Sequence, residues 1–179
     1  MTHFTTRKLS FDAVLCAMCA VLGGLSLDFG NLKLTFESVP ILIGALLFGP
    51  MDGMAIGGIG TLIYQLLRYG VSVTTPLWIL PYVLCGLVTG LYAAGKKFSL
   101  NCSQMLRIVI GAELMVTALN TGVLYLDSKI YGYYSFAYIF GTLLLRVVIC
   151  VAKAAVYALA LPSVLRPVEQ AFSKKRNQA

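Results

Sequence analysis

Six apolar segments, separated by short polar connections, fill almost the whole sequence. A helix that crosses a bilayer needs roughly 20 mostly apolar residues. Between the second and third segments, Gly49-Pro50 interrupts the apolar run, because proline lacks a backbone donor and glycine is conformationally permissive. The pattern predicts a single-domain, all-α membrane protein over residues 1–179, with six transmembrane helices at about 11–27, 36–48, 54–68, 77–94, 104–126 and 136–161.

The composition excludes the other fold classes. Hydrophobic residues make up 59% of the 179 residues, and charged residues only 12%. A soluble domain of this length has too little interior to bury so much apolar surface, and no separate soluble domain fits beside six helices. The cysteines lie mostly within apolar segments, where they act as small hydrophobic residues, so we expect neither a metal nor a cofactor. The first segment lacks a cleavage-site pattern, so we expect it to be retained.

Basic residues predict the orientation of the chain in the bilayer. With the N-terminus inside, nine lysines and arginines lie in inner segments and three in outer loops. The inner residues are Arg7, Lys8, Lys96, Lys97, Arg107, Arg166, Lys174, Lys175 and Arg176, and the outer residues are Lys33, Arg68 and Lys129. Cytoplasmic loops are enriched in Lys and Arg, so we expect both termini in the cytoplasm. The net charge of +7 then reflects contact with the bilayer, and nucleic acid is not an expected partner.

Charged residues inside the last two segments are costly at membrane depth. Arg146 and Lys153 are seven residues apart and share one helix face, as do Glu113 and Asn120 on the preceding segment. An antiparallel pairing places Glu113 level with Lys153 and Asn120 level with Arg146. We interpret Glu113 and Lys153 as a structural ion pair. Arg146, which has no acid at its level, suits an anionic ligand with Asn120 beside it; the alternative is that all four hold the helices together.

Other polar and aromatic residues converge on the outer half of the predicted bundle. Gln65 and Arg68 end the third segment, Trp78 and Tyr82 begin the fourth, and Tyr125 ends the fifth. Lys33 and Glu37 flank the first outer loop, which we expect to act as a lid together with Gly30 and Asn31. The predicted ligand-binding residues are therefore Arg146, Asn120, Arg68, Gln65, Trp78, Tyr82, Lys33, Glu37 and Tyr125. An interfacial aromatic belt is the alternative for most of the tyrosines.

Small residues at four-residue spacing predict close helix contacts. Ala13-xxx-Ala17 lies in the first segment, Gly53-xxx-Gly57 opens the third, and Gly86-xxx-Gly90 lies in the fourth. The sequence contains no GxxxxGK[ST] motif, so we do not expect the chain itself to hydrolyse a nucleotide. Its single histidine is His3 in the tail, which excludes histidine-based protease sites.

The run Phe36-Glu-Ser-Val-Pro-Ile-Leu-Ile-Gly-Ala-Leu-Leu-Phe-Gly-Pro50, followed by Met-Asp-Gly53, resembles the substrate-binding S components of energy-coupling factor (ECF) vitamin transporters. Ala13-xxx-Ala17 is similar to the contact of that family with its transmembrane T component. Asn120-Thr121 and Arg146 are similar to the folate-type branch. The resemblance implies vitamin uptake across a prokaryotic plasma membrane, with a T component and two cytoplasmic ATPases as partners.

Three functions compete at this stage. The first is capture of folate or a related anionic vitamin, or of another vitamin or micronutrient, by an S component. The second is a membrane-embedded enzyme that uses Glu113 and Lys153 as acid and base. The third is a membrane scaffold without a ligand. We expect the first and no enzymatic activity.

Overall fold

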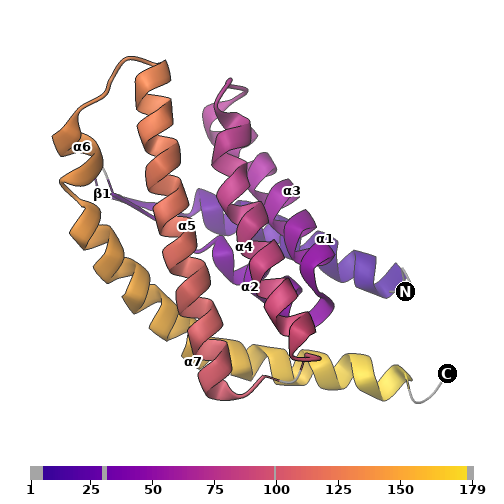
Figure 1. Ribbon diagram of the computed structural model, residues 1–179. Helices are drawn as coiled ribbons and strands as arrows, with labels where there is room; N and C mark the ends of the chain where they lie inside the picture. Colours follow the sequence, from indigo (N-terminus) through magenta and orange to yellow (C-terminus); the bar gives the residue numbers. More distant parts are fainter. Residues whose placement is uncertain (1–5, 30–31, 99, 177–179) are drawn as a thin grey trace.

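The computed structural model describes residues 6–29, 32–98 and 100–176. Along these residues, seven helices and one two-stranded hairpin follow each other (Figure 1). They are α1 (Thr6–Gly24), β1 (Leu27–Phe29), β2 (Leu32–Leu34), α2 (Ser38–Phe48), α3 (Pro50–Tyr69), α4 (Thr75–Gly95), α5 (Cys102–Ile130), α6 (Phe136–Phe140) and α7 (Leu143–Arg176). Helices therefore occupy all six predicted apolar segments, and the last segment is shared by α6 and α7.

The break between α2 and α3 lies where the sequence predicts it. Gly49 has a φ of 108°, a conformation that favours glycine, and its N–H donates to the carbonyl of Ala45 at 3.1 Å. Pro50 occupies the first turn of α3, where its missing N–H needs no helical partner. The two helices can thus pack against each other directly after the break.

Helix α3 is the centre of the N-terminal half, where it packs against α1, α2 and α4. Its glycines allow the backbones to approach. A Cβ added at Gly57 would lie 2.5 Å from the carbonyl oxygen of Tyr82 in α4, and one added at Gly60 would lie 2.6 Å from the Cβ of Cys19 in α1. The close contact predicted from Gly53-xxx-Gly57 and Gly86-xxx-Gly90 is therefore present between α3 and α4.

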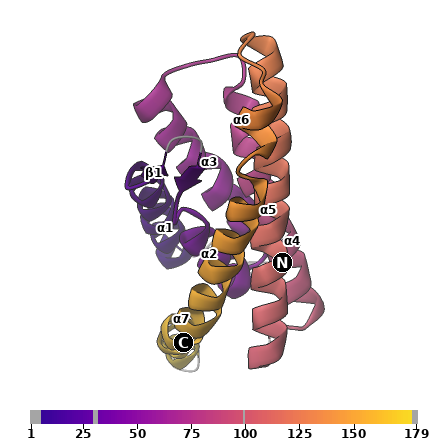
Figure 2. The same ribbon diagram turned by 90° about the vertical axis from the view of Figure 1, so that its left-hand side faces the viewer.

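Helices α5 and α7 form the other half of the fold, side by side (Figures 1 and 2). They connect to the first half through contacts of α5 with α4 and of α7 with α2. Leu42 of α2, Val109 of α5 and Ala154 of α7 belong to one cluster of buried apolar side chains. The two halves enclose a space between α3, α4, α5 and α7, and the site described below lies there.

The first outer loop differs from the prediction of a polar turn. Residues 27–29 and 32–34 pair as antiparallel strands, with Leu27 opposite Leu34 and Phe29 opposite Leu32. Alternation of apolar and charged residues on both sides of the turn favours this pairing. Gly30 and Asn31, which we expected to take part in a lid, lie outside the described residues.

The last helix also differs from the prediction. The last segment is predicted to end at about residue 161, but α7 continues through Pro162 and Pro167 to Arg176. A proline removes one helical hydrogen bond and bends a helix, yet the helix can resume beyond it. Figure 1 shows that the C-terminal part of α7 runs in a different direction from the part beside α5. At the other end, Gly141 and Thr142 separate α6 from α7.

Three helical segments in the described part of the chain are long and apolar enough to cross a membrane: Thr75–Gly95, Cys102–Ile130 and Phe136–Leu165. Helix α2 is apolar but has only 11 residues. The first turns of α1 carry Arg7, Lys8 and Asp12, which lower its hydropathy. Length and composition thus support a membrane protein with at least these three segments.

Candidate ligand-binding pocket

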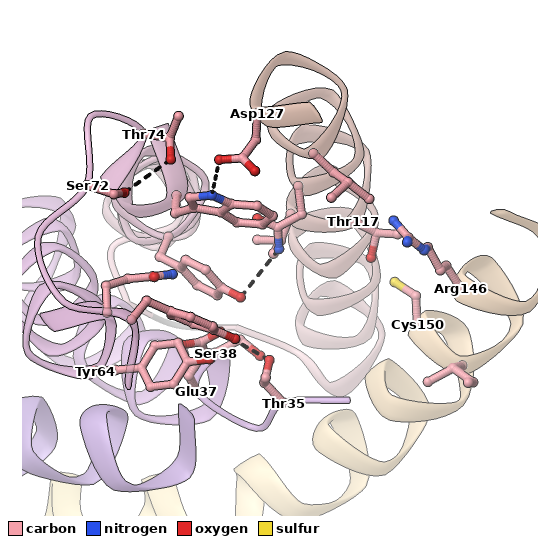
Figure 3. Close-up of a pocket in the computed structure, with 18 of the residues that line it drawn as sticks. Thr35, Glu37, Ser38, Tyr64, Ser72, Thr74, Thr117, Asp127, Arg146 and Cys150 are labelled. Atoms are coloured by element: carbon pink, nitrogen blue, oxygen red, sulfur yellow. Dashed lines mark hydrogen bonds between the residues drawn. The ribbon is translucent and has the colours of Figure 1, made fainter. Parts of the chain in front are cut away.

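A pocket of about 590 Å³ lies between the two halves of the fold. Helices α3, α4, α5 and α7 line it, together with residues between β2 and α2 and residues of the α5–α6 connection. Figure 3 shows Arg146 and Cys150 on one side, Glu37 with Thr35 and Ser38 on another, and Asp127 on a third. The volume of the pocket is within the range of about 300–1,000 Å³ that is typical of small-molecule sites.

A group with one carboxylate, one amide and two hydroxyls forms one end of this pocket. Glu37 is only 2% exposed, and Thr35 donates a hydrogen bond from Oγ1 to its Oε1 at 3.1 Å. The Tyr82 hydroxyl contacts the Glu37 carboxylate and accepts a hydrogen bond from Asn120 Nδ2 at 3.3 Å. We call Glu37, Tyr82 and Asn120 the acceptor cluster. Its members come from the connection just before α2, from α4 and from α5.

Glycine at position 23 makes room for this cluster. A Cβ there would lie 2.8 Å from Glu37 Oε2 and 2.9 Å from Cγ of Tyr64. Both distances are shorter than a normal contact, so any larger residue in α1 would displace the Glu37 carboxylate or the Tyr64 ring. Gly23 therefore fixes how closely α1 approaches the pocket.

A second polar group lies where α4, α5 and the α5–α6 connection meet. Trp78 donates from Nε1 to Asp127 Oδ1 at 3.3 Å, and the Tyr133 hydroxyl donates to Asp127 Oδ2. Partial burial and the hydrogen bond to the Asp127 carboxylate raise the pKa of the Tyr133 phenol above its ordinary value. One carboxylate thus links two aromatic side chains from different elements, and all three line the pocket.

The basic side of the pocket belongs to α7. Arg146, Cys150 and Lys153 follow one another along its inner face and all line the pocket. Lys153 Nζ lies 3.1 Å from Glu113 Oε2 of α5, and the Glu113 side chain is only 2% exposed. The ion pair therefore lies at the level that the antiparallel register of the two segments predicts. Lys153 is paired to an acid, and Arg146 is the second basic side chain with which α7 lines the pocket.

Six of the predicted ligand-binding residues line this one pocket, although they come from four helices and one connection: Glu37, Gln65, Trp78, Tyr82, Asn120 and Arg146. Two others lie elsewhere. Arg68 is exposed at the end of α3, and its Nη1 donates to Ser26 Oγ at 2.6 Å. Tyr125 packs edge-on against the ring of Tyr134. The side chain of Lys33 is outside the described part of the structure.

Sequence reasoning missed several pocket residues. Asp127, Ser72 and Thr74 lie between the predicted segments and were not among the predicted site residues, yet all three line the pocket. The Ser72 and Thr74 hydroxyls lie 3.2 Å apart at the start of α4. The signal in the sequence that could have identified Ser72 and Thr74 is their position just before Trp78, a predicted ligand-binding residue. Among the described residues, no group of three His, Cys, Asp or Glu side chains is arranged to hold a metal ion.

The membrane-capable helices and the pocket with aromatic, acidic and basic walls define a helical membrane protein with a small-molecule site. A family model described as "ECF transporter, substrate-specific component" matches residues 7–168, and the chain belongs to this family. It is therefore an integral membrane subunit of a transporter and not an enzyme, which confirms the expectation of no enzymatic activity.

Solved structures share the fold. The S component of a bacterial ECF transporter matches with a TM-score of 0.67 and 19% identity, covering 92% of this chain and 98% of the other. The S component for biotin from an ECF-type ABC transporter matches with a TM-score of 0.66 and 15% identity, covering 93% of this chain and 94% of the other. FolT bound with folic acid matches with a TM-score of 0.63 and 22% identity, covering 88% of this chain and 90% of the other. No curated protein sequence gave a significant match.

Proposed function

We propose that this S component captures folate or a related anionic vitamin from outside the cell. Arg146 carries the proposal, because it is a cation on an apolar helix and it lines the pocket. Arg146 is partly buried, and a guanidinium in such a site binds a carboxylate through charge-assisted hydrogen bonds. Trp78 and Tyr82 supply aromatic surface for a ring system. FolT bound with folic acid, which is 22% identical, shares this fold, and its ligand is of the proposed class.

The chain would deliver its ligand inward with partners. We propose that a T component and two cytoplasmic ATPases form the complete importer in a prokaryotic plasma membrane. The basic residues support six transmembrane helices with both termini in the cytoplasm. In this orientation the pocket lies in the outer half of the membrane. The start of α4, with Trp78, and the end of α5, with Asp127, are on that side. An S component for another vitamin is the second candidate, since the biotin S component shares the fold.

The vitamin assignment is tested by removing the Arg146 charge. Losing a charge-assisted hydrogen bond costs about 1.5–3 kcal/mol, so Arg146→Ala should weaken binding of folic acid by roughly 10- to 100-fold. Titration of folic acid into the purified variant by calorimetry measures the change. Arg107→Ala is the matched control, because Arg107 is exposed on α5 and bonds to the carbonyl of Ser103.

The outcomes of this titration separate the two candidates. Normal folic acid affinity in Arg146→Ala, combined with early thermal unfolding, would make Arg146 a structural residue and contradict the proposed site. A wild-type protein that binds biotin but not folic acid would select the second candidate.

The T-component contact is proposed for the exposed face of α1. Ala13 and Ala17 are exposed there, whereas Cys16 and Cys19 face the core. A bulky residue on that face should clash with a closely packed partner helix. Ala17→Trp should therefore reduce uptake by the assembled complex at least about tenfold, equivalent to about 1.4 kcal/mol, while ligand binding by the isolated subunit stays normal.

The control for the α1 contact is Ala118→Trp, which places the same side chain on the exposed face of α5. Radiolabelled vitamin uptake into proteoliposomes that contain the whole complex is the measurement. Equal uptake by wild type and Ala17→Trp would show that the T component binds elsewhere.

A further inference from the structure

The two sides of the pocket differ in chemistry. Arg146 lies on the α7 side, whereas Glu37 lies on the opposite side, beside Thr35 and Ser38 (Figure 3). The basic residues that line the pocket in the described part of the chain, Arg146 and Lys153, both belong to α7. A ligand that spans the pocket therefore meets a cation at one end and acceptors at the other.

We propose that the acceptor cluster binds the N–H-rich edge of a heteroaromatic ring, with Glu37 as its anchor, while Arg146 holds the anionic group of the same ligand. This inference rests on the proposed function and adds a second recognition site to it. The ligand class is a carboxylate that also carries adjacent ring and exocyclic N–H donors, as in a 2-amino-4-oxopyrimidine ring.

The open acceptor of Asn120 is the first support for this inference. Its Nδ2 donates a hydrogen bond to the Tyr82 hydroxyl. Its Oδ1 is buried and has no hydrogen-bond partner among the described residues. A buried carbonyl oxygen without a donor costs free energy. An anion would be repelled by this oxygen, whereas an N–H donor would satisfy it. Asn120 therefore belongs to the end of the pocket that binds the N–H donors of the ligand.

The buried carboxylate of Glu37 is the second support. It lines the pocket with 2% exposure, and the neighbours that contact its side chain in the described structure include the neutral hydroxyls of Thr35 and Tyr82. A carboxylate accepts parallel hydrogen bonds on its two oxygens, so it fits two adjacent N–H donors. Hydrogen bonds to an ionised group are roughly twice as strong as neutral ones. Glu37 should hence contribute strongly to affinity.

The experiment compares two probes that share one end. Folic acid has both the aminopyrimidinone edge and the carboxylate end, whereas p-aminobenzoyl-L-glutamate has the same carboxylate end without that edge. Glu37→Gln replaces one acceptor oxygen by a donor. It should weaken folic acid about 10- to 100-fold, as expected for charge-assisted hydrogen bonds, and leave p-aminobenzoyl-L-glutamate within about twofold of wild type.

Two reference variants complete the design. Arg146→Ala should weaken both probes. Asp52→Asn removes a carboxylate at the other end of α3, where it pairs with Lys8 at 2.7 Å, and should change neither affinity. Retained binding of p-aminobenzoyl-L-glutamate also shows that Glu37→Gln is folded. Glu37→Gln with unchanged folic acid affinity, or with equal losses for both probes, overturns the inference and leaves the Arg146 site intact.

Failure of the vitamin assignment gives a different pattern. If the wild type binds biotin in place of folic acid, the folate assignment fails, and the comparison moves to biotin and lipoic acid. These share a carboxylated chain, but only biotin has a ureido N–H edge. Glu37→Gln must then weaken biotin alone; unchanged biotin affinity overturns the acceptor cluster. A wild type that binds none of the four probes overturns both proposals.

Discussion

Replacing Gly86 by leucine is expected to prevent the protein from folding into a monodisperse species. A Cβ at Gly86 would overlap the backbone carbonyl group of Gly53 in α3, and backbone atoms cannot rotate away as a side chain can. Overpacking in a well-packed core typically costs about 1–3 kcal/mol and occasionally more. Gly86→Ala should lie in this range, and Gly86→Leu beyond it. Thermal unfolding and size-exclusion chromatography in detergent measure both.

The α3–α4 contact also determines the pocket, because Tyr64 and Gln65 of α3 and Trp78 and Tyr82 of α4 line it. We therefore expect Gly86→Ala to lose ligand affinity together with stability. Gly111 supplies the matched control: it lies inside α5, and a Cβ there would meet no atom within 4 Å. Gly111→Ala should be neutral or slightly stabilising, since alanine favours helix more than glycine does. Equal losses at both positions would show that helix propensity, and not close packing, is responsible.

Removing one member of the Glu113–Lys153 ion pair is expected to cost more stability than removing both. The pair is 3.1 Å apart and Glu113 is almost fully buried, so Glu113→Gln or Lys153→Met alone leaves one buried charge without its partner. Breaking a buried pair in this way typically costs about 3–5 kcal/mol. The double variant removes both charges, so its unfolding temperature should lie above that of either single variant.

A double-mutant cycle tests this coupling. The reference is Lys129→Met, which removes an exposed lysine from the last turn of α5 and should leave the unfolding temperature unchanged. Because Lys153 lines the pocket and Glu113 does not, only the Lys153 variant should also alter ligand affinity directly. Additive losses in the double variant would mean that the two side chains act independently and that the pair does not hold α5 to α7.

Local sequence rules predicted much of the backbone. The break at Gly49-Pro50 follows from properties of those two residues, so no tertiary information was needed. Helical periodicity placed Glu113 level with Lys153, because residues on one face of each antiparallel helix keep their register. The same rule placed Asn120 and Arg146 at the same pocket.

The sequence could not predict which way the ends of the helices and their connections turn. Arg68 and Gln65 share a face of α3 in sequence, yet Gln65 lines the pocket while Arg68 bonds to Ser26 beyond α1. The continuation of α7 past Pro162 likewise depends on more than the proline itself. A long side chain at a helix end has many accessible directions, and the neighbouring elements select among them.

By itself, the sequence determined the class of this protein and the residues that share helix faces: apolar segments must lie in a bilayer, and helical spacing fixes which charges align. Only the tertiary structure brought Glu37, Tyr82 and Asn120 together from the connection before α2, from α4 and from α5. It also connected Trp78 to Asp127 across 49 positions of the chain. The reason is physical: the rotation of each helix about its own axis is set by packing against its neighbours, and packing is a property of the assembled fold.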